Sequence, residues 1–133
     1  MSTENQCHEL DEAARRLGRE PSAAAIWGAY DLAWQATTAD VSPQPDAAHR
    51  WAVTLGGLMD AYGPLDELVP RNLPGPAADS VRPADTPALR AALVRLLRAT
   101  ATAVRDLPAP TATAVNARVQ ATSALTEAAE AWR

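Results

Sequence analysis

Apolar residues recur at spacings of three and four along residues 85–107, the most regular stretch of the sequence. Such spacing places an apolar stripe along one side of a helix and predicts that this stripe is buried. Asp85 or Thr86 can cap the start of this helix, and Pro87 suits its first turn. The predicted buried face consists of Leu89, Leu93, Leu96, Thr100, Val104 and Leu107, and the predicted exposed face consists of Ala91, Arg95, Arg98, Thr102 and Arg105.

Four further segments have helical periodicity, at residues 4–19, 22–39, 47–62 and 111–131. Prolines lie between these segments, as expected of residues that interrupt helical hydrogen bonding. We expect Gly63-Pro64 to break the third segment, with at most a short extra turn at residues 65–69. We also expect a short proline-containing joint to make the last two helices antiparallel neighbours. Gly56 and Gly57 fall inside a helix, where each costs about 1 kcal/mol relative to alanine, so a close neighbour is the expected compensation.

No segment alternates with the period of a strand over more than a few residues. The fold class that we predict is therefore all-α: a single-domain antiparallel up-and-down bundle of four to five helices spanning residues 1–133. Residues 1–4 are expected to be frayed, and residues 70–86 to form an irregular Pro-rich connection before the fourth long helix. The predicted apolar seam consists of Trp27, Trp34, Trp51, Leu55, Leu58, Leu93, Leu96, Val104, Val115 and Val119.

The charge of the chain limits the classes of partner. The 133 residues carry a net charge of −4, which argues against nucleic acid and against an anionic membrane surface as partners. Residues 1–70 hold 11 acidic residues and four arginines, net −7, whereas residues 71–133 hold five acidic residues and eight arginines, net +3. We expect this asymmetry to pair the two halves, either between helices of one chain or between subunits.

Composition also indicates a compartment. The lone cysteine, Cys7, cannot form an internal disulfide, which fits a reducing cytoplasm. The first residues do not resemble a signal peptide, and no apolar run is long enough to cross a membrane. All 12 basic residues are arginine, a usage that we attribute to a high-GC genome of the actinobacterial kind.

A metal centre is the first candidate site. Cys7, His8 and Glu12 lie close in sequence, and His49 could approach from another helix. However, the chain has neither the Glu-x-x-His pairs of a di-iron bundle nor a His-Glu-x-x-His motif. Nucleophile, phosphate-loop and redox motifs are also missing from the sequence. We therefore predict no metal, no cofactor and no catalytic residue.

The aromatic residues are a second candidate. Trp27, Tyr30 and Trp34 share one helix face at i, i+3 and i+7, and Trp51 and Tyr62 follow on the next helix. Rings in this pattern usually form core, and a chain without phenylalanine needs them there. They could instead line a pocket for an apolar or cationic ligand. Asp31 or Asp60 would be its polar anchor, although such acids more commonly occupy exposed flanking positions.

The third candidate is the arginine face of the helix at residues 85–107, made of Arg90, Arg95, Arg98 and Arg105. Such a stripe is usually the solvated back of an amphipathic helix, and a protein partner is its best functional interpretation.

Two functional hypotheses remain. The first is a non-enzymatic intracellular protein that acts through protein contacts, with a homodimer as one form. The alternative is a small-molecule binder or enzyme that uses the aromatic pocket between the second and third helices.

Overall fold

The computed structural model describes residues 3–38, 45–71 and 86–132. Five helices and no strand occur in these ranges, so the predicted all-α bundle is confirmed. Of the segments expected to be irregular, residues 1–2 and 72–85 lie outside the described residues. The helices are α1 (Thr3–Arg19), α2 (Ala23–Thr38), α3 (Pro45–Leu68), α4 (Pro87–Arg105) and α5 (Ala112–Glu130).

Hydroxyl side chains fix where three of the helices begin. The hydroxyl oxygens of Ser22, Thr86 and Thr111 accept hydrogen bonds from the backbone N–H three residues later, at 3.1, 3.2 and 3.0 Å. Each bond satisfies one of the N–H groups that a first helical turn leaves unpaired. Thr86 is therefore a cap of α4, and Pro87 occupies the first turn as predicted.

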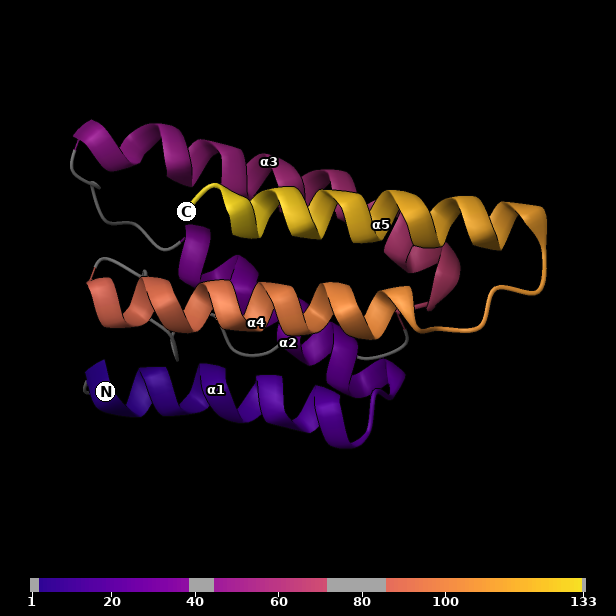
Figure 1. The fold of residues 1–133 in the computed structure, drawn as a ribbon, viewed down its shortest axis with the longest axis horizontal. Helices are drawn as coiled ribbons and strands as arrows, with labels where there is room; N and C mark the ends of the chain where they lie inside the picture. The colour runs from indigo at the N-terminus through magenta and orange to yellow at the C-terminus, as the bar shows by residue number, and fades with distance from the viewer. Residues whose placement is uncertain (1–2, 39–44, 72–85, 133) are drawn as a thin grey trace.

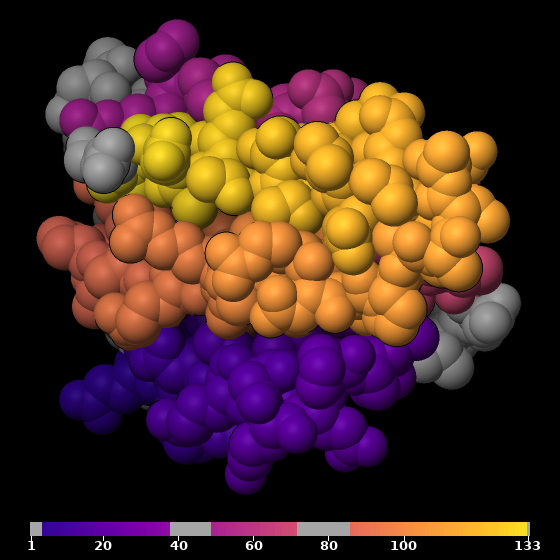
Figure 2. Space-filling view, turned by 45° about the vertical axis from the view of Figure 1, so that its right-hand side comes forward, coloured from indigo at the N-terminus to yellow at the C-terminus, as the bar shows by residue number. Residues whose placement is uncertain are grey.

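The bundle is organised around α4. This helix lies between α1 and α5, α3 packs against α5, and α2 crosses behind α4 (Figure 1). In the space-filling view, α4 forms a continuous band between α1 and α5 (Figure 2). Helices α1, α3 and α4 run in one direction, and α2 and α5 run in the other (Figure 1). The successive helices are thus antiparallel except for α3 and α4, which share a direction.

The predicted phase of α4 is confirmed. Its predicted inner face is buried up to Val104, with Leu107 half-buried, and every residue of its predicted outer face is exposed. The buried surface is broader than one stripe, because Ala92, Leu97 and Ala101 are also buried. A helix that contacts α1, α2 and α5 must bury more than one side.

The predicted placement of the two valines of α5 is wrong. Val115 and Val119, assigned to the apolar seam, are 39% and 57% exposed. The buried face consists instead of small residues at spacings of four and three, Ala117, Ala121, Ala124 and Ala128, together with Leu125 and Ala129. The physical reason is the close approach of α3, since a Cβ built on Gly57 would lie 2.8 Å from the carbonyl oxygen of Ala124. Valines on this face would hold the two helices apart.

The predicted end of the third helix is also wrong. Helix α3 runs through Gly63-Pro64 to Leu68. Beyond the proline, Leu65 is fully buried, and the carbonyl oxygen of Val69 accepts a 2.7 Å hydrogen bond from Trp27 Nε1. These tertiary contacts stabilise the turn that follows Pro64, which local propensity alone disfavours. Of the seam residues on α2 and α3, Trp27 and Leu58 are buried, and Trp34, Trp51 and Leu55 are half-buried.

Candidate functional site

The aromatic residues of α2 form a cluster with Tyr62 of α3. The ring centroids of Trp27 and Tyr30 lie 5.3 Å apart in an edge arrangement, and those of Tyr30 and Trp34 lie 6.4 Å apart and nearly parallel. Tyr62 lies 5.5 Å from Trp27 and 6.1 Å from Tyr30. Offset and edge contacts at these distances are favourable for aromatic rings. The predicted i, i+3, i+7 spacing thus brings three rings together, and α3 supplies a fourth.

Two hydrogen bonds hold this cluster in place. The hydroxyl of Tyr30 donates to the carbonyl oxygen of Leu58, and the indole of Trp27 donates to that of Val69. Burial raises the pKa of the Tyr30 hydroxyl above its ordinary value, and the neighbouring Tyr62 and Asp31 act in the same direction. Tyr30 therefore remains a neutral hydrogen-bond donor over a wide range of pH.

Asp31 pairs with Arg71, a residue just beyond the end of α3. The two guanidinium Nη atoms donate to the two carboxylate oxygens at 2.7 and 2.5 Å, and both side chains are more than four-fifths buried. The guanidinium carbon lies 5.0 Å from the centroid of the Trp27 ring. The hydrogen bond to Asp31 raises the pKa of Arg71. Asp31 is therefore neither a solvated flank residue nor a free anchor, because both of its oxygens are engaged.

A groove of about 470 Å³ lies beside this ion pair, between α2 and α3. The side chains of Met59 and Tyr62 at its rim are 59% and 45% exposed. The apolar and aromatic side chains of the groove thus face the Asp31–Arg71 ion pair, whose net charge is zero. The groove is lined by Tyr30, Asp31, Trp34, Met59, Tyr62 and Arg71.

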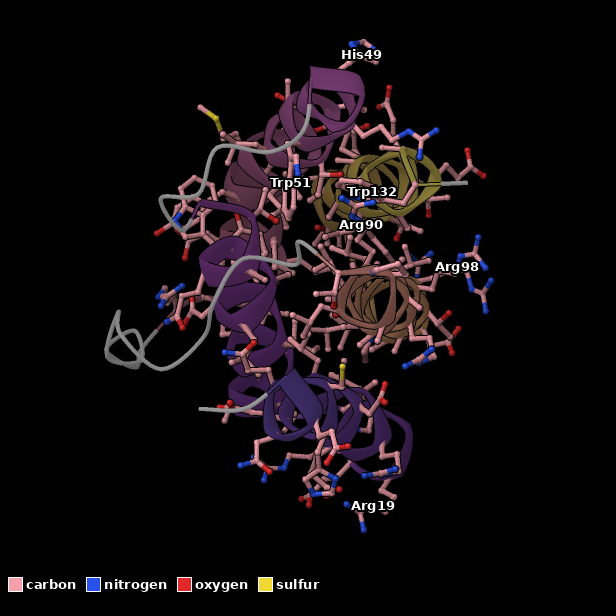
Figure 3. The ribbon with its side chains drawn as sticks, turned by 90° about the vertical axis from the view of Figure 1, so that its left-hand side faces the viewer. Arg19, His49, Trp51, Arg90, Arg98 and Trp132 are labelled. Atoms are coloured by element: carbon pink, nitrogen blue, oxygen red, sulfur yellow. The ribbon has the colours of Figure 1, made fainter. Side chains whose placement is uncertain are left out.

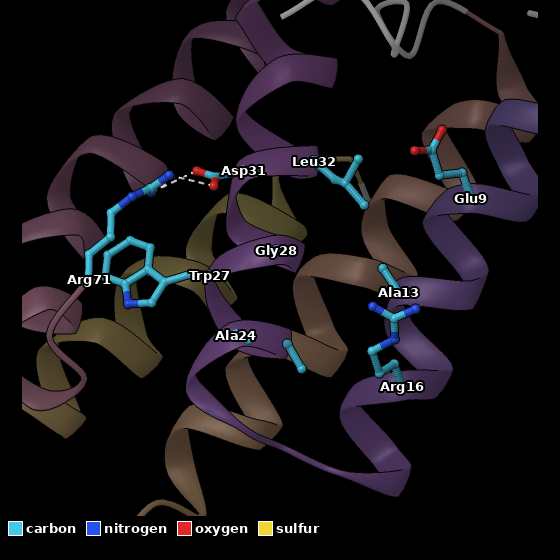
Figure 4. Close-up of a pocket in the computed structure, with 10 residues that line it drawn as sticks. Glu9, Ala13, Arg16, Ala24, Trp27, Gly28, Asp31, Leu32 and Arg71 are labelled. Atoms are coloured by element: carbon cyan, nitrogen blue, oxygen red, sulfur yellow. Dashed lines mark hydrogen bonds and ion pairs between the residues drawn. The ribbon is translucent and has the colours of Figure 1, made fainter. Parts of the chain in front are cut away.

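A second hollow, of about 330 Å³, lies on the α1 side of the same ion pair. Figure 4 shows Trp27, Asp31 and Arg71 at one end of it and Glu9 and Arg16 of α1 at the other. Its middle is lined mainly by small residues, Ala13 of α1 and Ala24, Ala25 and Gly28 of α2. We assign the candidate site to the α2–α3 groove because its walls are aromatic.

Two of the predicted pocket residues lie elsewhere. Trp51 packs against Trp132, with ring centroids 4.9 Å apart, at a different place in the bundle (Figure 3). Asp60 is exposed on α3 and does not line the groove. Neighbouring residues of a helix point about 100° apart, so Asp60 lies outside the groove although Met59 lines it.

The predicted partner surface on α4 is divided among several contacts. Arg95 donates two hydrogen bonds to Asp11 of α1, at 2.9 and 3.1 Å, and Arg105 lies 3.5 Å from Asp106. Two ion pairs, Asp11–Arg95 and Asp31–Arg71, each join an acid of residues 1–70 to an arginine of residues 71–133. The charge asymmetry is therefore used within the chain, which was one of the two predicted uses.

The other two arginines of that surface differ from each other. Arg98 is exposed, and it projects away from the bundle (Figure 3). Arg90 is half-buried, with its guanidinium carbon 5.3 Å from the centroid of the Trp132 ring. The four arginines thus have different surroundings and do not form one uniform face.

The metal-site residues are not assembled. Among the described residues, no three of the His, Cys, Asp and Glu side chains are grouped as metal ligands. Glu12 accepts hydrogen bonds from arginines one and two turns later on α1. His49 projects from α3 at the opposite end of the view from α1 (Figure 3).

Sequence reasoning missed Arg71 and Met59. Arg71 follows the predicted end of the third helix in a Pro-rich stretch, where no periodicity assigns a residue to a face. The excess of arginine in the second half was the only signal that it pairs with an acid of the first half. Met59 follows an apolar residue of the seam, and its position at the groove depends on how α2 crosses α3.

Comparisons with protein families, with curated proteins and with solved structures found no match to this chain. Among the described helices, none combines the length and apolar character needed to cross a bilayer. The geometry of the chain is thus the basis for a functional proposal.

Proposed function

We propose that the chain binds a small, neutral and largely aromatic molecule in the α2–α3 groove. The observation that carries this proposal is the arrangement of Tyr30, Trp34, Met59 and Tyr62 around the Asp31–Arg71 pair. A volume of about 470 Å³ lies in the range of pockets that hold small organic ligands, which are typically apolar with a few polar groups.

The polar group in the groove supports binding of a neutral ligand. Asp31 and Arg71 compensate each other in a bidentate pair, so neither offers an unpaired charge to an ion. The same engagement leaves Asp31 poorly suited to general acid–base chemistry, and the Tyr30 hydroxyl already donates to Leu58. The role that we assign to the groove is therefore recognition, with aromatic stacking as its main source of affinity.

The test uses the methyl group of Met59, followed by NMR during titration with indole or quinoline as neutral bicyclic probes. Ring currents of a bound probe should shift this methyl signal in the wild type. Trp34→Ala, which removes one wall of the groove, should weaken the response by about tenfold, the effect of roughly 1–1.5 kcal/mol of stacking.

Trp51→Ala is the matched control, because it removes a half-buried tryptophan that does not line the groove. It should respond to the probes as the wild type does. The proposal is wrong if Met59 is unaffected by both probes in the wild type, or if the two tryptophan variants lose the response equally.

A second function, contact with a second copy of the chain, is favoured by the exposed valines of α5. Val115 and Val119 lie one turn apart and form an apolar patch on the outer face of the helix. We propose that this patch joins two copies and that their contact is apolar, since the described interhelical ion pairs lie within the chain. Light scattering should find a dimer that persists at high salt and that Val119→Asp dissociates; a wild-type monomer would contradict this.

We also propose that the protein acts in the cytoplasm. Cys7 is the sole cysteine and is half-buried against the core, so the fold relies on packing and forms no internal disulfide.

A further inference from the structure

A second cluster of side chains lies at the junction of α3, α4 and the end of α5. It consists of Trp51, Arg90 and Trp132, which we call the Trp–Arg cluster (Figure 3). The rings of Trp51 and Trp132 meet edge to face at 4.9 Å, and the guanidinium of Arg90 lies 5.3 Å from the Trp132 ring centroid. No residue of this cluster lines the α2–α3 groove.

Three buried hydrogen-bond donors of this cluster have no acceptor in the part of the chain that the structure describes. These are the indole Nε1 of Trp51, the indole Nε1 of Trp132 and the guanidinium Nε of Arg90. A buried donor without a partner is costly, because folding removes the water to which it was bonded. Three such donors in one contacting group are therefore unusual, and they call for an acceptor.

The charge of Arg90 distinguishes this cluster from the other contact between an arginine and a tryptophan ring, that of Arg71 with Trp27. Arg71 also lies near a tryptophan ring, but its charge is compensated by Asp31. Within the described ranges, no carboxylate forms an ion pair with Arg90. The cluster thus combines a positive charge with donors only, since indole and guanidinium groups have no acceptor atom.

We propose that the Trp–Arg cluster binds a small oxyanion, either free phosphate or a carboxylate group. Such an anion has enough oxygen lone pairs to accept hydrogen bonds from three N–H groups, and its charge would compensate that of Arg90. A neutral carbonyl would satisfy the donors but would leave the charge of Arg90 uncompensated. The chemistry of the cluster therefore favours an anion.

Access to the donors depends on Trp132. This residue follows Glu130, the last residue of α5, and its backbone forms only a 3.4 Å hydrogen bond to Ala129. Its ring is half-buried, so the cluster reaches the surface. The backbone of Trp132 lies beyond α5 and is less restrained than those of Trp51 and Arg90, which lie within α3 and α4.

The experiment follows the indole N–H signals of the ¹⁵N-labelled protein during titration with sodium phosphate and, separately, sodium acetate, at constant ionic strength. The signals of Trp51 and Trp132 should shift together, with one binding constant. The signal of Trp27 is an internal reference, because its N–H already donates to Val69. Tighter binding of phosphate or of acetate identifies which oxyanion the cluster prefers.

Arg90→Gln should weaken binding by at least tenfold, whereas Arg98→Gln, which removes an exposed arginine from the same helix, should leave it unchanged. Trp51→Phe deletes one donor while keeping a ring against Trp132, and it should weaken binding by about tenfold. It provides the same test if Arg90→Gln does not fold. The proposal is overturned if neither anion shifts the Trp51 and Trp132 signals, or if the folded variants bind as the wild type does.

Discussion

At the scale of single residues, identical amino acids have different roles in this protein. Gly56 and Gly57 are neighbours in α3, but only Gly57 faces α5 closely. A Cβ at Gly57 would lie 2.8 Å from both the carbonyl oxygen of Ala124 and the Cβ of Ala128, whereas a Cβ at Gly56 would have no atom within 4 Å. The close neighbour expected from the sequence therefore exists for Gly57 and not for Gly56.

Alanine at these two positions should have opposite effects. Gly56→Ala should stabilise the fold by about 0.5–1 kcal/mol, since alanine favours the helix and meets no obstacle. Gly57→Ala should destabilise it by about 1–3 kcal/mol, because its methyl group would push against the backbone of α5. Urea denaturation of both variants measures the difference. Equal effects would show that α3 and α5 are not in close contact.

Tyr30 should make stability depend on pH in the alkaline range. Its folded-state pKa lies above the ordinary value of 10.0, mainly because it is buried. Below pH 10 both states keep the proton, and above it only the unfolded state loses the proton, so stability falls as pH rises. One titrating group changes the free energy of unfolding by at most about 1.4 kcal/mol per pH unit.

The measurement compares the free energy of unfolding by urea between pH 9 and pH 11. It is simplified because the chain has no lysine, whose side chain would titrate in this range. Tyr30→Phe should be less stable at pH 9, since it lacks the bond to Leu58, but its stability should decline less with pH. Tyr62→Phe keeps the buried Tyr30 hydroxyl and removes only a smaller contribution to its raised pKa, so it should reduce the decline less than Tyr30→Phe does. An unchanged decline in Tyr30→Phe would contradict the assignment.

At the scale of helices, α3 shows how tertiary contacts override a local signal. Pro64 lies inside the helix, where it removes a hydrogen bond and its ring crowds the carbonyl of Asp60. The final turn forms because Leu65 is buried and because the carbonyl oxygen of Val69 accepts a hydrogen bond from Trp27 Nε1. This turn also positions Arg71 against Asp31, so the candidate groove depends on it.

Pro64→Ala should therefore stabilise the protein by about 1–2 kcal/mol, which is the relief of the interior proline less the added freedom of the unfolded chain. Pro87→Ala is the matched control, because Pro87 lies in the first turn of α4, where proline is well tolerated; it should be neutral or destabilise by about 0.5 kcal/mol. Thermal denaturation provides both values. A loss of stability in Pro64→Ala would show that packing of the half-buried proline ring outweighs the helix penalty.

At the scale of the whole molecule, α4 connects the bundle. It contacts α1, α2 and α5, and its ion pair between Arg95 and Asp11 joins the acidic and basic halves. That pair is largely exposed and contributes at most about 1 kcal/mol, so apolar burial along α4 is the main source of cohesion. Helix α1 lies at the edge of the molecule (Figure 1).

Hydrogen exchange should consequently be slowest in α4. Its central amides should exchange only through global unfolding, while those of α1 should exchange through local opening with a lower free energy. Leu93→Ala, at a fully buried position, should cost about 2–5 kcal/mol and should reduce the protection of the central α4 amides, which exchange through global unfolding. Protection of α1 equal to that of α4 would disagree with this hierarchy.

Local patterns were sufficient to predict the helices, the phase of α4 and the grouping of Trp27, Tyr30 and Trp34, because each depends on spacing within one segment. Three features were decided only by tertiary structure. The phase of α5 follows from the close approach of α3, the end of α3 follows from the burial of Leu65, and the Asp31–Arg71 pair joins residues 40 positions apart. Periodicity records which side of a helix is apolar, but the distance between helices determines which side chains fit, and that distance is a property of the folded molecule.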